Sequence, residues 1–137
     1  MTPLLVVAAA LIDADGRVLL TQAASGKLHA GSWEFPGGKL APGESPVAGL
    51  VRELREELGI ETEASCLAPF GFNSAPLDSE ESGELVLLVY VCRKWRGQVR
   101  GVEGQATRWC EPSDLLTMNL APIDRPIAAQ LRDLLVG

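Results

Sequence analysis

Three glutamates lie close together in the sequence, at a spacing that could bring their carboxylates together to bind a metal ion or catalyse a reaction. Glu53, Glu56 and Glu57 are separated by three positions and one, so on a helix all three carboxylates share one face. Like charges at this spacing repel, and carboxylates in a last helical turn also meet the negative end of the helix dipole. In isolation such a string is also typical of a solvated helix surface. Clustered carboxylates are equally the hard oxygen ligands that suit Mg²⁺, which would relieve their repulsion.

The helix that must carry these glutamates is the clearest element in the sequence. Ser45 is a good N-cap, Pro46 fits the first turn, and Gly59 is a natural C-terminal stop. Between them, apolar residues recur at helical spacing and predict one buried stripe: Val47, Leu50, Val51, Leu54 and Leu58.

Extended segments surround this helix. Leu4–Ile12 and Arg17–Gln22 flank a turn and predict a two-stranded hairpin. Three further strands are expected at 62–72, 84–95 and 106–111, with a polar, acidic loop at 73–83. Pro112, Ser113 and Asp114 open a brief helical turn. A closing helix is expected over 124–135, with its inner side formed by Ile127, Leu131 and Leu134. With neither repeat nor linker, residues 1–137 predict one α/β domain with a mixed sheet.

Composition sets limits on the partners. The chain has 137 residues, a formal net charge of −6 and 47% apolar residues, which fits a globular protein with a real core. The acidity argues against binding to a nucleic acid polymer. Three cysteines without a CxxC pair encode neither a disulfide framework nor a zinc site. Leu4–Ile12 is too short to span a bilayer and has no basic residue before it. We therefore expect a cytoplasmic protein that does not bind membranes, either a monomer or a homodimer.

A longer pattern surrounds the glutamates. Gly38, five residues, Glu44, seven residues and then Arg52-Glu53-Leu54-Arg55-Glu56-Glu57-Leu58-Gly59-Ile60 match every fixed position of the Nudix box, so the chain resembles the Nudix hydrolases. Three further segments look like the MutT branch of that family: Trp33 to Lys39 (WEFPGGK), Val102 to Gln105 followed by Trp109, and Leu120 to Pro126.

The resemblance implies the Nudix fold, a mixed β-sheet sandwiched between helices. It implies an enzyme that uses Mg²⁺, with Mn²⁺ able to substitute. The implied substrates are small-molecule nucleoside triphosphates, above all 8-oxo-dGTP in nucleotide pool sanitation, and the products are the monophosphate and pyrophosphate.

The metal ligands come from the same resemblance. Main-chain oxygens of Gly37 or Gly38 would join the carboxylates of Glu53, Glu56, Glu57 and Glu103. Glu53 is the first choice for the group that aligns or deprotonates water, with Glu103 second, and Arg52 would orient a glutamate by a bidentate contact.

The substrate-binding residues are implied in the same way. Lys39 would contact phosphate, and Glu34, Phe35 and Pro36 would line the nucleotide pocket. Asp124 occupies the position at which the MutT pattern has a base-reading Asn. An ionised Asp only accepts hydrogen bonds, which suits a cytosine amino group or the N7–H of 8-oxoguanine. Its other interpretation is an N-cap of the last helix.

Two departures from the MutT pattern bear on the base. Ala23 stands where many MutT-type sequences have an Arg that contacts the nucleotide, and the acidic loop at 76–84 is long. The alternative enzyme is a CTP or modified-dCTP pyrophosphohydrolase, which Asp124 would suit. A noncatalytic Nudix-like nucleotide-sensing module is the alternative of another class, although such modules typically lose box carboxylates that this chain keeps.

Overall fold

The computed structural model describes residues 3–23, 30–77 and 83–136 of the chain. Its helices are α1 (Pro46–Leu58) and α2 (Arg125–Val136), with short 3₁₀ helices at Ala64–Cys66 and Pro112–Thr117. Its strands are β1 (Leu4–Leu11), β2 (Val18–Gln22), β3 (Trp33–Glu34), β4 (Gly37–Lys39), β5 (Leu67–Pro76), β6 (Glu84–Cys92) and β7 (Thr107–Cys110).

The described strands form two sheets. One has the order β4-β1-β6-β5, in which β1 and β6 run parallel and the other pairs are antiparallel. The other has the order β3-β2-β7. The predicted mixed sheet is confirmed. The predicted hairpin of Leu4–Ile12 with Arg17–Gln22 forms only at its turn, where Ile12 makes an antiparallel bridge to Val18 and the Asp13 N–H donates to the Arg17 oxygen. As a pair of strands the prediction is wrong, because β1 and β2 belong to different sheets.

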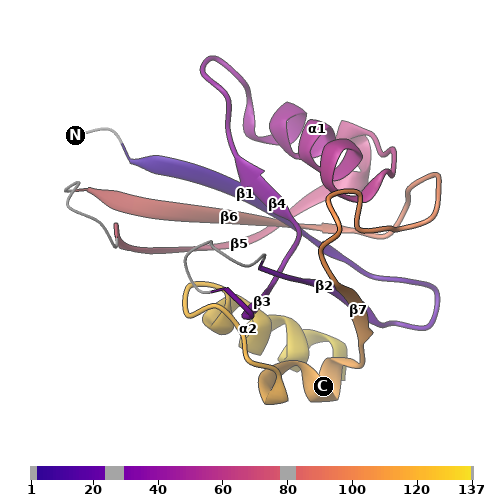
Figure 1. Cartoon of the computed structure of the whole chain (residues 1–137). Helices are drawn as coiled ribbons and strands as arrows, with labels where there is room; N and C mark the ends of the chain where they lie inside the picture. Colours follow the sequence, from indigo (N-terminus) through magenta and orange to yellow (C-terminus); the bar gives the residue numbers. More distant parts are fainter. Residues whose placement is uncertain (1–2, 24–29, 78–82, 137) are drawn as a thin grey trace.

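Two helices cover opposite faces of the strands, α1 on one side and α2 on the other (Figure 1). Successive residues of β1 point alternately to the face covered by α1 and to the face covered by α2. Val7, Ala9 and Leu11 pack with α1, and Ala8 and Ala10 pack in the cluster that contains α2. A strand buried on both faces needs a continuous apolar run, which explains the sequence of Leu4–Leu11. The predicted arrangement of a mixed sheet between helices is confirmed.

The ends of α1 form as expected. The Ser45 hydroxyl accepts a hydrogen bond from the Ala48 N–H at 3.3 Å, and Gly59 closes the helix in the left-handed conformation at φ 69°. Leu50, Leu54 and Leu58 are fully buried against the sheet. The buried stripe therefore fixes which face of α1 carries the glutamates.

The segment from Trp33 to Lys39 crosses from one sheet to the other. Its first part, β3, pairs with β2, and its last part, β4, pairs with β1. Between them, the Pro36 carbonyl accepts a hydrogen bond from the Ala9 N–H at 2.9 Å. The WEFPGGK motif thus lies at the junction of the two sheets.

Several sequence-based boundaries are corrected. The strand expected at 62–72 begins only at Leu67, because Ala64–Cys66 forms a 3₁₀ turn, and it continues to Pro76 by pairing with β6. The strand expected at 84–95 ends at Cys92. Leu134 is 63% exposed, contrary to prediction, and Leu135 packs against the core in its place. No helix in the described part of the chain has the length and apolar character needed to span a membrane.

Candidate active site

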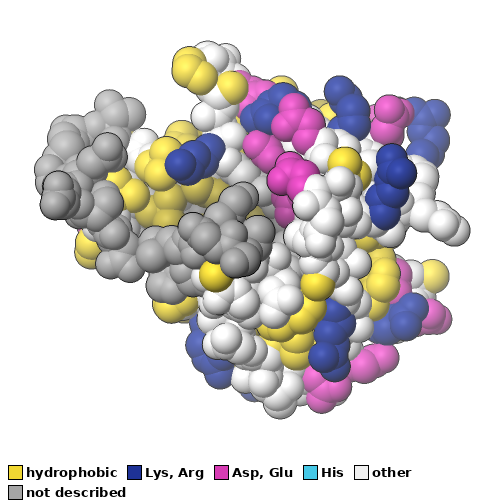
Figure 2. Space-filling model, viewed as in Figure 1, with side chains coloured by type: hydrophobic (Ala, Val, Ile, Leu, Met, Phe, Trp, Pro, Cys, Tyr) yellow, Lys and Arg dark blue, Asp and Glu magenta, His cyan; other side chains and the backbone are white. Residues whose placement is uncertain are grey.

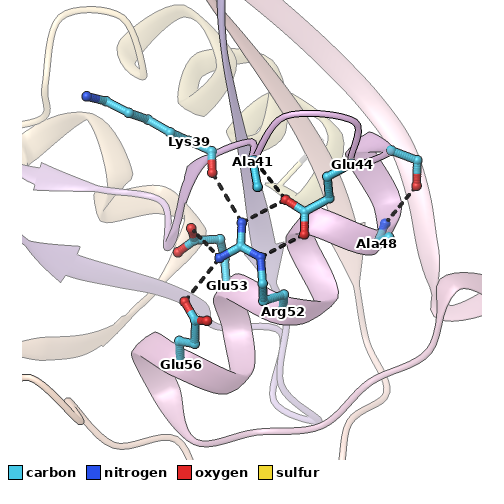
Figure 3. A network of polar contacts seen from close by, with 8 residues as sticks. Lys39, Ala41, Glu44, Ala48, Arg52, Glu53 and Glu56 are labelled. Carbon is cyan, nitrogen blue, oxygen red and sulfur yellow. Dashed lines mark hydrogen bonds and ion pairs between the residues drawn. The ribbon is translucent and has the colours of Figure 1, made fainter.

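The guanidinium of Arg52 is the centre of a polar network on α1 (Figure 3). It donates to both carboxylate oxygens of Glu44, at 2.7 and 2.8 Å. It also donates to Glu53 and to Glu56, each at 3.1 Å, and to the main-chain oxygen of Lys39 at 3.3 Å. The bidentate contact expected of Arg52 is present, and its partner is Glu44. One side chain therefore fixes three carboxylates and the end of β4 together.

Glu44 is the firmly ionised member of this network. Its hydrogen bonds from Arg52, and a further one from the Ala41 N–H at 2.9 Å, lower the pKa of its carboxyl to about 2. Glu44 in turn raises the pKa of Arg52 further above its ordinary value. Each partner therefore favours the charged form of the other. Figure 2 shows the result as acidic and basic side chains interleaved over α1.

Glu57 lies deeper, between α1 and β4. Its carboxylate accepts a hydrogen bond from the Gly37 N–H at 3.1 Å. Burial raises the pKa of Glu57 to about 7, and the negative charges of Glu34, Glu53 and Glu103 add to this increase. Four acidic side chains from three segments of the chain therefore act on the same small region.

The carboxylate of Glu53 rests directly on Gly38. A Cβ atom at residue 38 would lie 2.5 Å from Glu53 Cδ and 2.6 Å from both carboxylate oxygens. Only glycine leaves this room, which gives the second glycine of the motif a physical role. Carboxylate oxygens and a nearby main chain are the hard donors that Mg²⁺ takes, so the residues present fit such an ion.

The acidic side chains do not form a complete coordination sphere for a metal ion. Within residues 3–23, 30–77 and 83–136, no three His, Cys, Asp or Glu side chains form a group that could hold a metal ion. The hydrogen bonds account for this spacing, because Arg52 draws Glu53 and Glu56 toward itself while Glu57 turns to Gly37. The predicted ligand set of Gly37, Gly38, Glu53, Glu56, Glu57 and Glu103 thus stays a prediction.

Glu103 reaches the site on a turn that is fastened to the end of α1. The Val102 N–H donates to the main-chain oxygen of Glu57 at 3.1 Å, and Arg100 N–H donates to that of Leu58 at 3.1 Å. Glu103 itself is exposed. Sequence reasoning gave Gln105 no role of its own, yet its side chain contacts this same region.

The residues predicted to meet the base lie at the sheet junction. Phe35 is 4% exposed, and its N–H donates to Asp124 Oδ2 at 3.0 Å, linking the β3–β4 segment to the start of α2. Asp124 is also 4% exposed, and its burial raises the pKa of its carboxyl to about 7. The carboxylate of Asp124 is thus bonded to the segment that was predicted to line the nucleotide pocket. Pro36 is buried and Glu34 half-buried beside it.

The remaining sequence-based candidates are peripheral or undescribed. Lys39 is exposed, and its side chain extends away from the Arg52 network (Figure 3). Most of the long acidic loop, residues 78–82, lies outside the described residues, as does His29.

Comparison with known proteins agrees with this geometry. A family model described as the NUDIX domain matches residues 2–131. The chain is 43% identical to a CTP pyrophosphohydrolase of Escherichia coli over 88% of this chain and 86% of that protein. It is 30% identical to the E. coli 8-oxo-dGTP diphosphatase, over 88% and 89% respectively.

Solved structures give the same result. The solution structure of the E. coli ORF135 protein superposes with a TM-score of 0.84 at 36% identity, covering 98% of this chain and 91% of that chain. A MutT structure from a study of Aliivibrio salmonicida and Vibrio cholerae has a TM-score of 0.80 at 30% identity, covering 97% and 99%. The chain belongs to the Nudix family. Within that family it is a MutT-type Nudix hydrolase, an enzyme and not a noncatalytic sensing module.

The contacts that the Arg52 guanidinium makes with Glu44, Glu53 and Glu56 lead to a first prediction. Lysine keeps the charge but cannot hold Glu44 bidentately while also reaching Glu53 and Glu56. We expect Arg52→Lys to lower kcat/KM for nucleoside triphosphate hydrolysis by about 10–100-fold, the usual effect of losing a residue that orients metal ligands. Arg55→Lys, on the exposed side of the same helix, is the matched control and should stay within about twofold of the parent. Near-parental turnover of Arg52→Lys would contradict the role of the Arg52 guanidinium in positioning these carboxylates.

Asp124 generates a second prediction, about stability and pH. Its raised pKa means that the folded chain holds a proton that the unfolded chain loses above pH 3.8. The resulting stabilisation is complete below pH 3.8 and is lost as pH rises through about 7. Asp124→Asn does not titrate and can still accept from Phe35. The free energy of unfolding of the variant, minus that of the parent, should therefore increase with pH. One pKa unit corresponds to about 1.4 kcal/mol, so the increase should reach up to about 4 kcal/mol.

Urea unfolding of the parent and the variant from about pH 4.5 to about pH 8 measures this difference. Asp133→Asn makes the same change on the exposed surface of α2 and serves as the control. A difference between Asp124→Asn and the parent that does not vary with pH would show that burial does not perturb this carboxyl.

Proposed function

We propose that this enzyme is a Mg²⁺-dependent pyrophosphohydrolase whose preferred substrates are CTP or modified cytidine triphosphates. The observation that carries the base class is Asp124, a buried carboxylate held beside Phe35 at the junction of the sheets. Above its raised pKa of about 7, the Asp124 carboxylate accepts hydrogen bonds and donates none, and the cytosine edge presents an amino group that donates. The 43% identity to a CTP pyrophosphohydrolase supports the same base class.

The phosphate end of the site is proposed from its oxygen donors. Main-chain oxygens of Gly37 or Gly38, with Glu53, Glu56, Glu57 and Glu103, would hold the ion. A bound Mg²⁺ would screen the triphosphate and lower the pKa of a coordinated water. Lys39 contributes a positive charge toward the phosphates from the exposed end of β4.

Within this arrangement Glu53 is proposed to align or deprotonate the attacking water, and Glu103 is the second choice. Glu53 is suited to the role because two neighbours limit its movement: Arg52 bonds one oxygen, and Gly38 lies against the carboxylate. Preorganised groups of this kind act without rearranging during the reaction. Arg52 serves as a positioning residue, and Glu56 completes the group that it holds.

An oxidised purine nucleotide of the 8-oxo-dGTP type is the second candidate substrate. The N7–H of 8-oxoguanine donates a hydrogen bond that an ionised Asp124 could accept, whereas the O6 of the same base would meet it unfavourably. The 8-oxo-dGTP diphosphatase relative, at 30% identity, supports this class. Glu34, Phe35 and Pro36 would line the pocket for either base.

The wider setting is proposed with the function. We expect the chain to act as a single Nudix domain over residues 1–137, in the cytoplasm, as a monomer or homodimer. Its partners would be small-molecule nucleotides and not nucleic acid polymers or membranes.

A nucleotide panel tests the function directly. Purified protein is assayed against CTP, dCTP, a modified dCTP, 8-oxo-dGTP, dGTP and ATP, with Mg²⁺, with Mn²⁺ and with a chelator. We expect turnover only with metal, a higher kcat/KM for the cytidine nucleotides, and a monophosphate with pyrophosphate as products. Release of phosphate and a diphosphate would contradict the proposed bond cleavage, and a preference for 8-oxo-dGTP would favour the second candidate.

Asp124→Asn tests whether residue 124 recognises the base of the substrate. Asn retains an acceptor for Phe35 and gains a donor, so the variant should favour 8-oxo-dGTP relative to CTP. A base-reading hydrogen bond accounts for about 1–3 kcal/mol of discrimination, so the ratio of kcat/KM values should change by roughly tenfold or more. Asp133→Asn, on the exposed surface of α2, should leave the ratio unchanged. Identical ratios in Asp124→Asn and the parent would mean that the base is recognised elsewhere.

A further inference from the structure

Glu103 lies on a turn whose position needs an explanation. The turn spans residues 101–104 and is closed by a hydrogen bond from the Gly104 N–H to the Gly101 oxygen at 3.0 Å. Glu103 is exposed, and a carboxylate on an exposed turn has no fixed position unless the turn is anchored. The anchors on this turn therefore decide where the Glu103 carboxylate lies.

The side chain of Gln105 supplies one of these anchors by bridging two main chains. Its Nε2 donates to the main-chain oxygen of Glu57 at 3.0 Å. Its Oε1 accepts from the N–H of Glu103 at 3.0 Å. A single amide group thus joins the backbones of two acidic residues that are 46 positions apart in sequence, both of them proposed metal ligands.

The bridge requires the chemistry of glutamine at this position. One end must donate to a carbonyl and the other must accept from an N–H, which a side-chain amide does and a carboxylate does not. The carbonyl of Glu57 also lies at the C-terminal end of α1, where helix carbonyls lack partners within the helix. Val102 N–H donates to the same oxygen at 3.1 Å, so the turn is fastened there twice.

The turn is also packed closely on residue 105. A Cβ atom at Gly101 would collide with the main-chain oxygen of Gln105, so glycine at 101 allows the turn to fold over this segment. Losing the Gln105 amide would leave the Val102 hydrogen bond in place, while Glu103 would lose its direct tie. The turn should then remain attached to α1 with a less defined position for Glu103.

We infer that Gln105 is a positioning residue that sets the Glu103 carboxylate relative to Glu57 through the bridge between their main chains. This inference rests on the proposed role of Glu103 at the metal-binding end of the site. Gln105 touches neither the substrate nor the ion, so its effect on the reaction passes through Glu103.

A double-mutant cycle tests this dependence. Gln105→Met keeps the length of the side chain and removes both hydrogen bonds. We expect it to lower kcat by about 10–100-fold, as for other residues that orient metal ligands, with a smaller change in KM. In the Glu103→Gln background, adding Gln105→Met should lower kcat no further, because the residue through which it acts is already lost. Gln130→Met, on the exposed surface of α2, is the matched control.

Two measurements without turnover accompany the kinetics. Mn²⁺ binding to the nucleotide-free protein, followed by electron paramagnetic resonance, should weaken by about 10–100-fold in Gln105→Met and not in Gln130→Met. Amide hydrogen exchange should accelerate at Glu103 in Gln105→Met, while the amides of α1 keep their parental rates. A variant that loses stability as a whole would show faster exchange throughout α1.

The outcomes separate this inference from the proposed function. Equal losses from Gln105→Met in the parent and in the Glu103→Gln background would overturn the inference, as would parental kinetics and Mn²⁺ affinity in Gln105→Met. If Glu103→Gln alone keeps parental activity and Mn²⁺ affinity, the assignment of Glu103 is wrong and the inference fails with it. Absence of nucleotide hydrolysis in the parent would instead refute the proposed function, and the exchange rates would still report the bridge.

Discussion

Mutual repulsion among carboxylates is the constraint on which this site depends. Glu53, Glu56 and Glu57 occupy the last turns of α1, where the helix dipole also disfavours negative charge. The structure offsets this cost locally: Arg52 bonds Glu53 and Glu56, and the Gly37 N–H bonds Glu57. Glu44 then fixes Arg52 from the loop before the helix. Hydrogen bonds and the ion pairs of Arg52 thus hold these carboxylates close together in the folded chain.

Segments that are distant in sequence meet around this charge through their main chains. The Gly37 N–H reaches Glu57, the Lys39 oxygen reaches Arg52, and the Val102 N–H reaches the end of α1. Main-chain contacts depend on backbone position more than on side-chain identity, so they require the strands and the helix to be placed first. The buried leucines of α1 and the doubly covered strand β1 supply that placement.

Features set by neighbouring residues could be predicted from the sequence. The ends of α1 follow from Ser45 and Gly59, and its orientation follows from the leucine spacing. The Nudix box placed the candidate carboxylates on one helix, and the resemblance indicated the fold. Pairing between distant segments could not be predicted in this way. A tight turn between β1 and β2 is compatible with a hairpin, but β4 and β6 occupy both edges of β1, and β3 and β7 occupy both edges of β2. The bridge made by Gln105 depends on two residues whose proximity exists only in the fold.

The crossing of Trp33 to Lys39 between the two sheets has a consequence for how such enzymes diversify. Phe35 bonds Asp124 at one end of this segment and Gly37 bonds Glu57 two residues later. Residue 124 immediately precedes α2, whereas Glu53, Glu56 and Glu57 belong to α1 on the opposite side of the sheets (Figure 1). Under the proposed roles, a substitution at residue 124 would change base recognition while the carboxylates of α1 keep their own contacts. The range of substrates would then change in small mutational steps that leave bond cleavage intact.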